Sequence, residues 1–129
     1  LSVRTQVGAG ADSQIAGFVI AGEGTKKIVV RAVGPGLAPG VTSYLADPTL
    51  GLWKLNPTTG TWTLIAANDN WGGASTLKTA FSSVGMGALA TDSKDAALMM
   101  ELEPGIYTAQ INGVGATTGV ALVEAYELP

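Results

Sequence analysis

Apolar and polar side chains alternate along most of this chain, in short runs separated by turns rich in glycine and proline. Successive side chains of a β-strand point to opposite faces, so this alternation predicts half-buried strands. The expected strands cover residues 1–7, 14–21, 26–33, 49–55, 62–67, 96–103, 106–112 and 120–128. Strands that follow one another through short turns favour an all-β fold, an antiparallel two-sheet sandwich of jelly-roll-like type with about eight or nine strands.

One segment follows the helical period instead. Leu77, Phe81 and Val84 are spaced as i, i+4 and i+7, and Gly85 follows where a helix would end. We therefore expect one short helix over residues 75–84, placed as a flap over one end of the sandwich.

The last expected strand is apolar on both of its faces. One face carries Val120, Leu122, Tyr126 and Leu128, and the other carries Ala121, Val123 and Ala125. One of these faces can lie on the core of the domain. The other needs a cover, which could be a second sheet edge, the N-terminal strand or another molecule.

The chain has 129 residues and contains neither cysteine nor histidine. This length predicts a single domain, residues 1–129, with a core large enough to be stable without disulfides. The missing residue types exclude thiolate and imidazole nucleophiles and zinc sites built from cysteine and histidine. We therefore do not expect an enzyme.

The net charge is -3 and the seven basic residues are scattered, which argues against a nucleic-acid partner. No apolar run approaches the ~20 residues that a membrane span requires. The chain begins at Leu1 rather than at methionine. We interpret it as a mature form whose export signal has been removed, and we expect a secreted, extracellular or cell-surface protein.

Charged residues make up 13% of the chain, against about 25% in typical soluble domains. One interpretation is an extracellular surface covered by threonine, serine and asparagine. The other is that much of the surface is buried against neighbouring subunits. The composition leaves both open.

Oxygen-bearing side chains are densest at Asn68-Asp69-Asn70-Trp71, and Asp92 and Asp95 lie in a later loop that could approach them. Calcium binds carboxylate and amide oxygens of such loops, although the spacing does not match an EF-hand. The candidate calcium ligands are Asn68, Asp69, Asn70 and Asp92, and no other cofactor is expected. The alternative is a network of Asx turns that caps a strand, with Trp71 packed at its rim.

Two further groups of residues have chemical potential. Outward carboxylates are expected at Glu101, Glu103, Glu124 and Glu127. Carboxylates paired across a cleft hydrolyse glycosides, but on the outer face of a strand they usually serve solubility. The tryptophans Trp53, Trp62 and Trp71 could form an aromatic platform for sugars, although at least one is expected in the core.

The stretch from Leu50 to Leu128 resembles the bacterial pre-peptidase C-terminal type of β-sandwich, a secreted accessory module. The matching runs are LIAANDNW (64–71), ALMMELEPGIYTAQING (97–113) and TTGVALVEAYEL, which ends at Leu128. Segments 16–22 and 31–37 also resemble parts of domains from large exported bacterial proteins. The resemblance implies a sandwich fold and an adhesive or assembly role. Some members of the family bind calcium or collagen, but here the acidic corner is reduced to Asn68, Asp69 and Asn70.

Our leading hypothesis is a self-associating extracellular structural subunit, a filament, pilus-like or matrix protein, assembled by strand addition and apolar contacts. Residues 1–7 could be exchanged with a neighbouring copy about the hinge Gly8-Ala9-Gly10, with pairing inside the domain as the alternative. The expected interface residues are Leu1, Val3, Thr5, Val7, Val120, Leu122, Tyr126 and Leu128. The second hypothesis is an accessory carbohydrate- or matrix-binding module of the bacterial cell surface.

Overall fold

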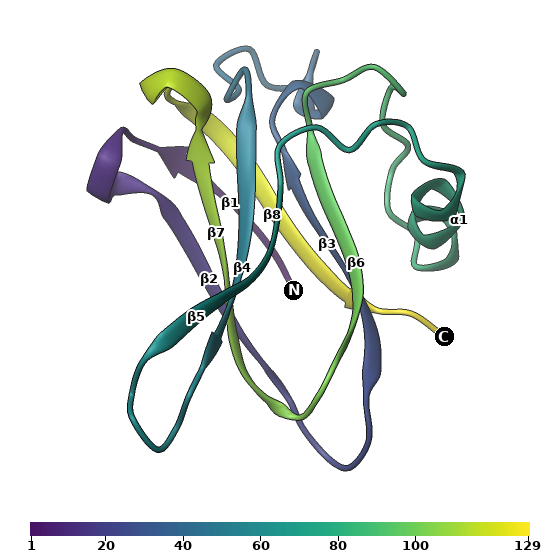
Figure 1. Ribbon diagram of the computed structural model, residues 1–129. Coiled ribbons are helices and arrows are strands. Elements are labelled where there is room, and N and C mark those ends of the chain that lie inside the picture. The colour runs from purple at the N-terminus through teal and green to yellow at the C-terminus, as the bar shows by residue number, and fades with distance from the viewer.

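The computed structural model describes residues 1–129, apart from the side chain of Ala11, and over this range the strands form two four-stranded antiparallel sheets (Figure 1). The first, called here the β1 sheet, has the order β1 (Ser2–Val7), β8 (Gly119–Glu127), β3 (Lys26–Val33), β6 (Ala96–Leu102). The second, the β2 sheet, has the order β2 (Gln14–Ile20), β7 (Gly105–Gly113), β4 (Pro48–Leu55), β5 (Trp62–Asn68). The predicted antiparallel two-sheet sandwich is confirmed.

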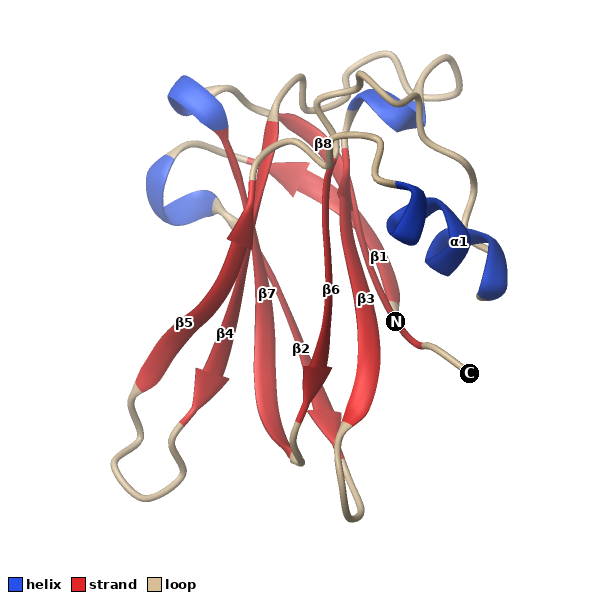
Figure 2. Ribbon diagram, turned by 45° about the vertical axis from the view of Figure 1, so that its right-hand side comes forward, coloured by secondary structure: helices blue, strands red, loops and turns tan.

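The two sheets lie face to face, as Figure 2 shows. Contacts between them join β1 to β2, β8 to β7, β3 to β4 and β6 to β5. Each side of the sandwich is therefore formed by two outermost strands, β1 with β2 on one side and β5 with β6 on the other. The connections contain short 3-10 turns, namely η1 (Gly10–Asp12), η2 (Pro35–Leu37) and η3 (Val114–Ala116).

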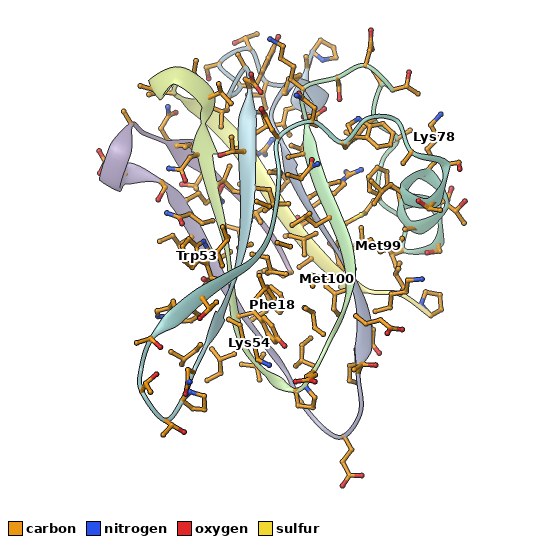
Figure 3. The ribbon with its side chains drawn as sticks, viewed as in Figure 1. Phe18, Trp53, Lys54, Lys78, Met99 and Met100 are labelled. Carbon is orange, nitrogen blue, oxygen red and sulfur yellow. The ribbon has the colours of Figure 1, made fainter. Side chains whose placement is uncertain are left out.

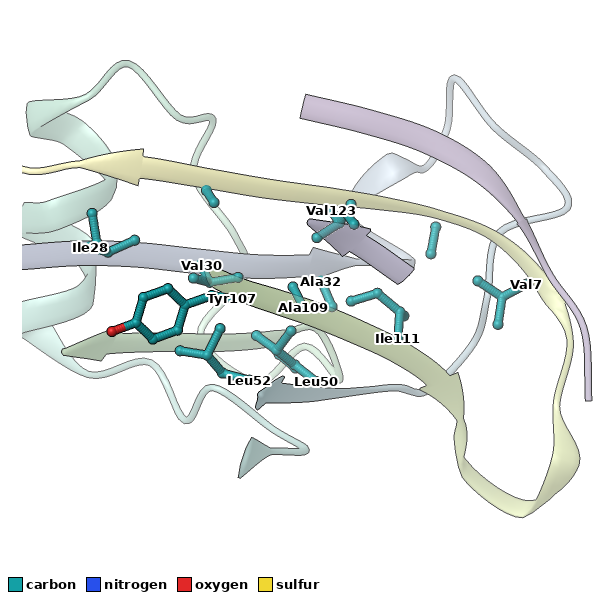
Figure 4. Close-up of a cluster of buried hydrophobic side chains, with 14 of the residues drawn as sticks. Val7, Ile28, Val30, Ala32, Leu50, Leu52, Tyr107, Ala109, Ile111 and Val123 are labelled. Atoms are coloured by element: carbon teal, nitrogen blue, oxygen red, sulfur yellow. The ribbon is translucent and has the colours of Figure 1, made fainter. Parts of the chain in front are cut away.

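The main core fills the space between the sheets, and Figure 4 shows part of it. Its side chains are those that the period-two alternation places inward, such as Leu50 and Leu52 of β4 and Tyr107 and Ile111 of β7, each at most 1% exposed. Ile28 and Val30, which alternate along β3, also belong to this core. Burying a side chain of this size stabilises the fold by about 1.5–3 kcal/mol.

Helix α1 (Ser75–Ser83) does not cover an end of the sandwich, as the sequence had led us to expect. It lies against the outer face of the β1 sheet, where Phe81 packs with Trp71 and with Val29 and Val33 of β3 in a second core cluster. The reason is that β3 and β8 carry apolar side chains on both faces, so the outer face of this sheet also had to be covered. Gly85, with φ 73°, follows the end of the helix as predicted.

The outer side of β8 is covered by the same cluster. Leu122, Tyr126 and Leu128 are partly buried against it. The second apolar face of the last strand thus has its cover within the chain, from α1 and the segment that follows it.

Glu124 was expected to be a solubilising surface charge, and this was wrong. It is 8% exposed, and its Oε2 lies 2.8 Å from both Nε and Nη2 of Arg31, which is 3% exposed. Arg31 also donates to the carbonyl oxygen of Gly87 and lies 4.7 Å from the centroid of the Phe81 ring. The Arg31–Glu124 pair therefore connects the β1 sheet to Gly87, in the segment after α1.

Candidate functional site

The side of the sandwich formed by β1 and β2 combines free strand edges with exposed apolar residues. β1 pairs along its whole length with β8 of the same chain. Its core-facing side carries four of the predicted interface residues, Leu1, Val3, Thr5 and Val7. Val7 is fully buried, whereas Leu1 and Val3 are 39% and 41% exposed. The first half of β1 therefore extends beyond the cover that the opposite sheet provides.

Strand β2 lacks the usual protection of a sheet edge. It pairs with β7 in continuous register from Gln14↔Ile111 to Ile20↔Gly105, and its sequence, QIAGFVI, contains no charged residue and no proline. Its outward residues Ile15 and Val19 are 61% and 66% exposed. Natural edge strands usually carry charges, prolines or bulges that prevent pairing with another chain. An uncharged, regular and apolar edge is a surface suited to strand addition.

Ile15 and Val19 are not among the interface residues predicted from the sequence. The sequence does indicate an apolar strand here, because QIAGFVI has no charged residue on either of its faces. What the sequence could not show is that β2 is the outermost strand of its sheet, which depends on the long-range order of the strands.

Gln14 joins the two edges. Its side chain is 6% exposed, and its Nε2 donates to the carbonyl oxygen of Val3 at 3.1 Å. Further along, a hollow of about 280 Å³ separates the start of β1 from the end of β2, with Leu1, Phe18 and Tyr126 in its lining. β1 and β2 are therefore joined near Gln14 and separated by this hollow near Leu1.

The other residues predicted for the interface lie elsewhere. Leu122, Tyr126 and Leu128 face the second core cluster, and Val120 forms a parallel bridge with Tyr44. Leu1 and Tyr126 line the same hollow, but the other residues of the two predicted halves lie on opposite faces of the β1 sheet.

The three tryptophans have different environments. Trp71 is 4% exposed, and its Nε1 donates to the carbonyl oxygen of Ala90 at 3.0 Å and to Ser93 Oγ at 3.1 Å. Trp53 lies on the face of the β2 sheet that points away from the core, as Figure 3 shows, and Trp62 on β5 is 43% exposed. An aromatic surface therefore contains Trp53 and Trp62 and excludes Trp71.

The Asn/Asp corner is partly used by the fold itself. Asn68 Oδ1 accepts from the backbone N–H of Ala97 at 3.1 Å, and its Nδ2 donates to the carbonyl oxygen of Asn70 at 3.1 Å. Asn70 and Asp92 are exposed, as is Asp69. In the part of the chain that the structure describes, no group of three or more acidic, histidine or cysteine side chains is arranged to hold a metal ion.

Asp69 has a neighbouring carboxylate, that of Asp47. Partial burial, together with the charge and hydrogen bonding of Asp47, raises the pKa of Asp69 above its usual value, and Lys94 opposes the shift. This corner therefore brings two acidic side chains together, with Lys94 as a nearby opposite charge.

Among the described residues, no helix has the length and apolar character needed to span a membrane.

No protein-family model matches the sequence, and no curated protein matches it. Solved structures do share its fold. The pre-peptidase C-terminal domain of a collagenase from Bacillus anthracis superposes with a TM-score of 0.56 at 12% identity, covering 98% of this chain and 88% of that one. The predicted resemblance to this type of β-sandwich is confirmed for the fold.

Two other solved structures are similar to a comparable degree. The Yersinia pseudotuberculosis-derived mitogen has a TM-score of 0.53 at 12% identity, over 97% of this chain and 82% of its own. CorA, described as a surface-associated copper-binding protein important in copper acquisition by Methylomicrobium album BG8, has a TM-score of 0.54 at 12% identity, over 99% and 93%. At these identities the property shared with all three proteins is the fold.

Proposed function

We propose that this chain is a non-catalytic, extracellular structural module that associates with further copies of itself through the side formed by β1 and β2. The observation that carries the proposal is the β2 edge, which is regular, uncharged and flanked by the exposed side chains of Ile15 and Val19. The low charge of the whole chain and the shared fold with a bacterial collagenase domain and a surface-associated protein support the same role.

The sequence of β2 is suited to pairing with itself. Its seven residues are centred on Gly17, so an antiparallel pair of β2 strands about a two-fold axis places Ile15 of each copy opposite Val19 of the other. A two-fold contact requires a surface of this self-complementary kind. Such pairing joins the two β2 sheets into one continuous sheet, with the apolar side chains packed across the junction.

A two-fold contact closes as a dimer, so a filament needs a second contact. The exchange of β1 that the sequence predicted would supply one. The free edge of β1 is available for it, and the turn from Gly8 to Ser13 connects β1 to β2.

The test is the molar mass of the purified chain, measured by light scattering or sedimentation over a wide range of protein concentration. We expect oligomers for the natural chain and dissociation for Val19→Lys, because a lysine at an edge strand opposes pairing. Leu64→Lys is the matched control, since Leu64 is 47% exposed on β5, the opposite edge of the same sheet.

A natural chain that stays monomeric at every concentration would overturn the proposal. Equal effects of the two lysine variants would also overturn the role of β2. Deletion of residues 1–7 separates the two routes, because loss of oligomers beyond the dimer, with circular dichroism unchanged, indicates exchange of β1.

A further inference from the structure

The outer face of the β2 sheet contains a groove of about 370 Å³ beside Trp53. We call it the Trp53 groove, and its lining includes Gly51, Trp53, Leu64, Asp69, Gln110 and Asn112. These residues come from β4, β5 and β7 and from the turn after β5. The volume lies at the lower end of the range for small-ligand sites, which combine an apolar wall with a few polar groups.

The indole of Trp53 lies over Gly51, beside its cross-strand neighbours. A Cβ atom at Gly51 would lie 3.2 Å from Trp53 Nε1 and 3.3 Å from Leu64 Cδ1, so both side chains reach over this glycine. Trp53 stands opposite Leu64 on β5 and opposite Thr108 on β7. A half-buried tryptophan supported in this way offers a rigid apolar surface and loses little conformational entropy when a ligand stacks on it.

Polar groups surround this apolar surface. Gln110 Nε2 donates to Ser13 Oγ at 3.0 Å, which orients the amide and leaves its Oε1 as an acceptor. The carboxamide of Asn112 adds donors and an acceptor, and the carboxylate of Asp69 accepts. A sugar ring has the matching chemistry, with C–H groups on its faces and hydroxyl groups around its edge.

The charge of the groove and of the chain favours neutral over anionic polysaccharides. The lining of the groove is uncharged except for Asp69, and the net charge of the chain is -3. Anionic polysaccharides would be repelled by this charge, whereas neutral ones are not.

We propose that the Trp53 groove binds a neutral polysaccharide, with one pyranose ring stacked on Trp53 and its hydroxyl groups bonded to Gln110, Asn112 and Asp69. Across β4 and β5, Trp53 is opposite Leu64, and two residues further along Leu55 is opposite Trp62. Trp53 and Trp62 are therefore diagonal neighbours, which lie about 7–8 Å apart in such a pair of strands. A second sugar unit of the same polymer reaches Trp62. The groove lies over β4, β5 and β7, and its lining contains no residue of β2, so Val19→Lys leaves the lining unchanged.

The experiment measures binding of the purified chain to microcrystalline cellulose, insoluble xylan, chitin and mannan, with alginate as the anionic comparison. Titration with cellohexaose and xylohexaose, followed by calorimetry, gives the affinity for any polymer that binds. We expect binding to at least one neutral polysaccharide, and we expect Trp53→Ala to weaken it about tenfold or more, as for an aromatic anchor.

Gly51→Ala is the second variant, because it keeps the tryptophan but places a methyl group 3.2 Å from the indole nitrogen, so that the indole has to shift away from its present position. It should weaken binding while the melting temperature changes little, since the groups it displaces are side chains at the surface. Val19→Lys is the control and should bind the polysaccharide like the natural chain.

Three results would overturn the site: no binding to any of the neutral polymers, binding to alginate alone, or full binding by Trp53→Ala with an unchanged circular dichroism spectrum. Because Val19→Lys removes self-association and Trp53→Ala removes sugar binding, failure of one proposal is distinguishable from failure of the other.

Discussion

Asp95 is the residue whose replacement tests the architecture most directly. It is fully buried just before β6. Its Oδ1 accepts from the backbone N–H groups of Gly34 at 2.7 Å and Gly36 at 3.1 Å, and its Oδ2 accepts from Ser93 Oγ at 2.8 Å. One carboxylate therefore connects the turn after β3 to the segment that leads into β6.

The cost of Asp95→Ala follows from the groups left without a partner. The N–H of Gly34 is buried, that of Gly36 is partly buried, and the hydroxyl of Ser93 can turn toward water. A hydrogen bond to a charged group contributes about 1.5–3 kcal/mol, so one full loss and one partial loss predict a destabilisation of about 3 kcal/mol. For a chain of 129 residues this corresponds to a fall in melting temperature of about 11 °C.

Asp95→Asn separates geometry from charge. Asparagine keeps one oxygen for the two glycine N–H groups, and its amide nitrogen can donate to Ser93, so we expect a loss of about 1 kcal/mol. Asp92→Ala is the matched control, because Asp92 is an exposed acid in the same segment, and it should change stability by less than about 0.5 kcal/mol.

Urea unfolding followed by tryptophan fluorescence is the assay, and the buried Trp71, whose backbone N–H donates to the carbonyl oxygen of Asp95, is a nearby reporter. Equal stability of Asp95→Ala and Asp92→Ala would refute the reasoning. Equal losses for Asp95→Ala and Asp95→Asn would show that charge, rather than the placement of the oxygens, is what matters.

Three other predictions concern charge and metal. Because the pKa of Asp69 is raised in the folded state, its ionisation destabilises the fold, so Asp69→Asn should raise the melting temperature at neutral pH, and the gain should vanish as pH falls through the carboxyl range. Glu124→Gln should lower the free energy of unfolding in urea by about 3–5 kcal/mol, because it leaves the charge of Arg31 buried without its partner. Glu127→Gln removes one member of an exposed pair and should lower it by less than about 1 kcal/mol. Similar losses for the two variants would contradict this contrast. Calcium or a chelator should leave the melting temperature unchanged, since the amide of Asn68 is already bonded within the fold, whereas a rise with calcium would support the predicted calcium site.

The strands could be predicted from the sequence because their information is local. The alternation of Ile28, Val30 and Ala32 with Lys27, Val29 and Arg31 identifies β3 and its inner face without knowledge of any partner strand. In the same way, the helical spacing that ends at Gly85 identified α1. A period of two or 3.6 residues is a property of the backbone, so it appears in any sequence that must bury one face.

The sequence also indicated that β8 needed a cover on both faces, but it could not identify the cover. The cover is α1, which is about 40 residues away from β8 in the chain. Its position on β8 is therefore decided by long-range packing. The same limit applied to Glu124, whose partner Arg31 is 93 positions away.

The sequence by itself determined the secondary structure, the sandwich class and the scarcity of charge, because each of these depends on residues close together in the chain or on composition. The tertiary structure alone decided which strands are outermost, so that β2 exposes Ile15 and Val19, and which tryptophan reaches the surface, so that Trp53 lies in a groove while Trp71 is buried. Edges, grooves and buried ion pairs are made by segments distant in sequence, and the order in which those segments pair is not encoded in any local pattern.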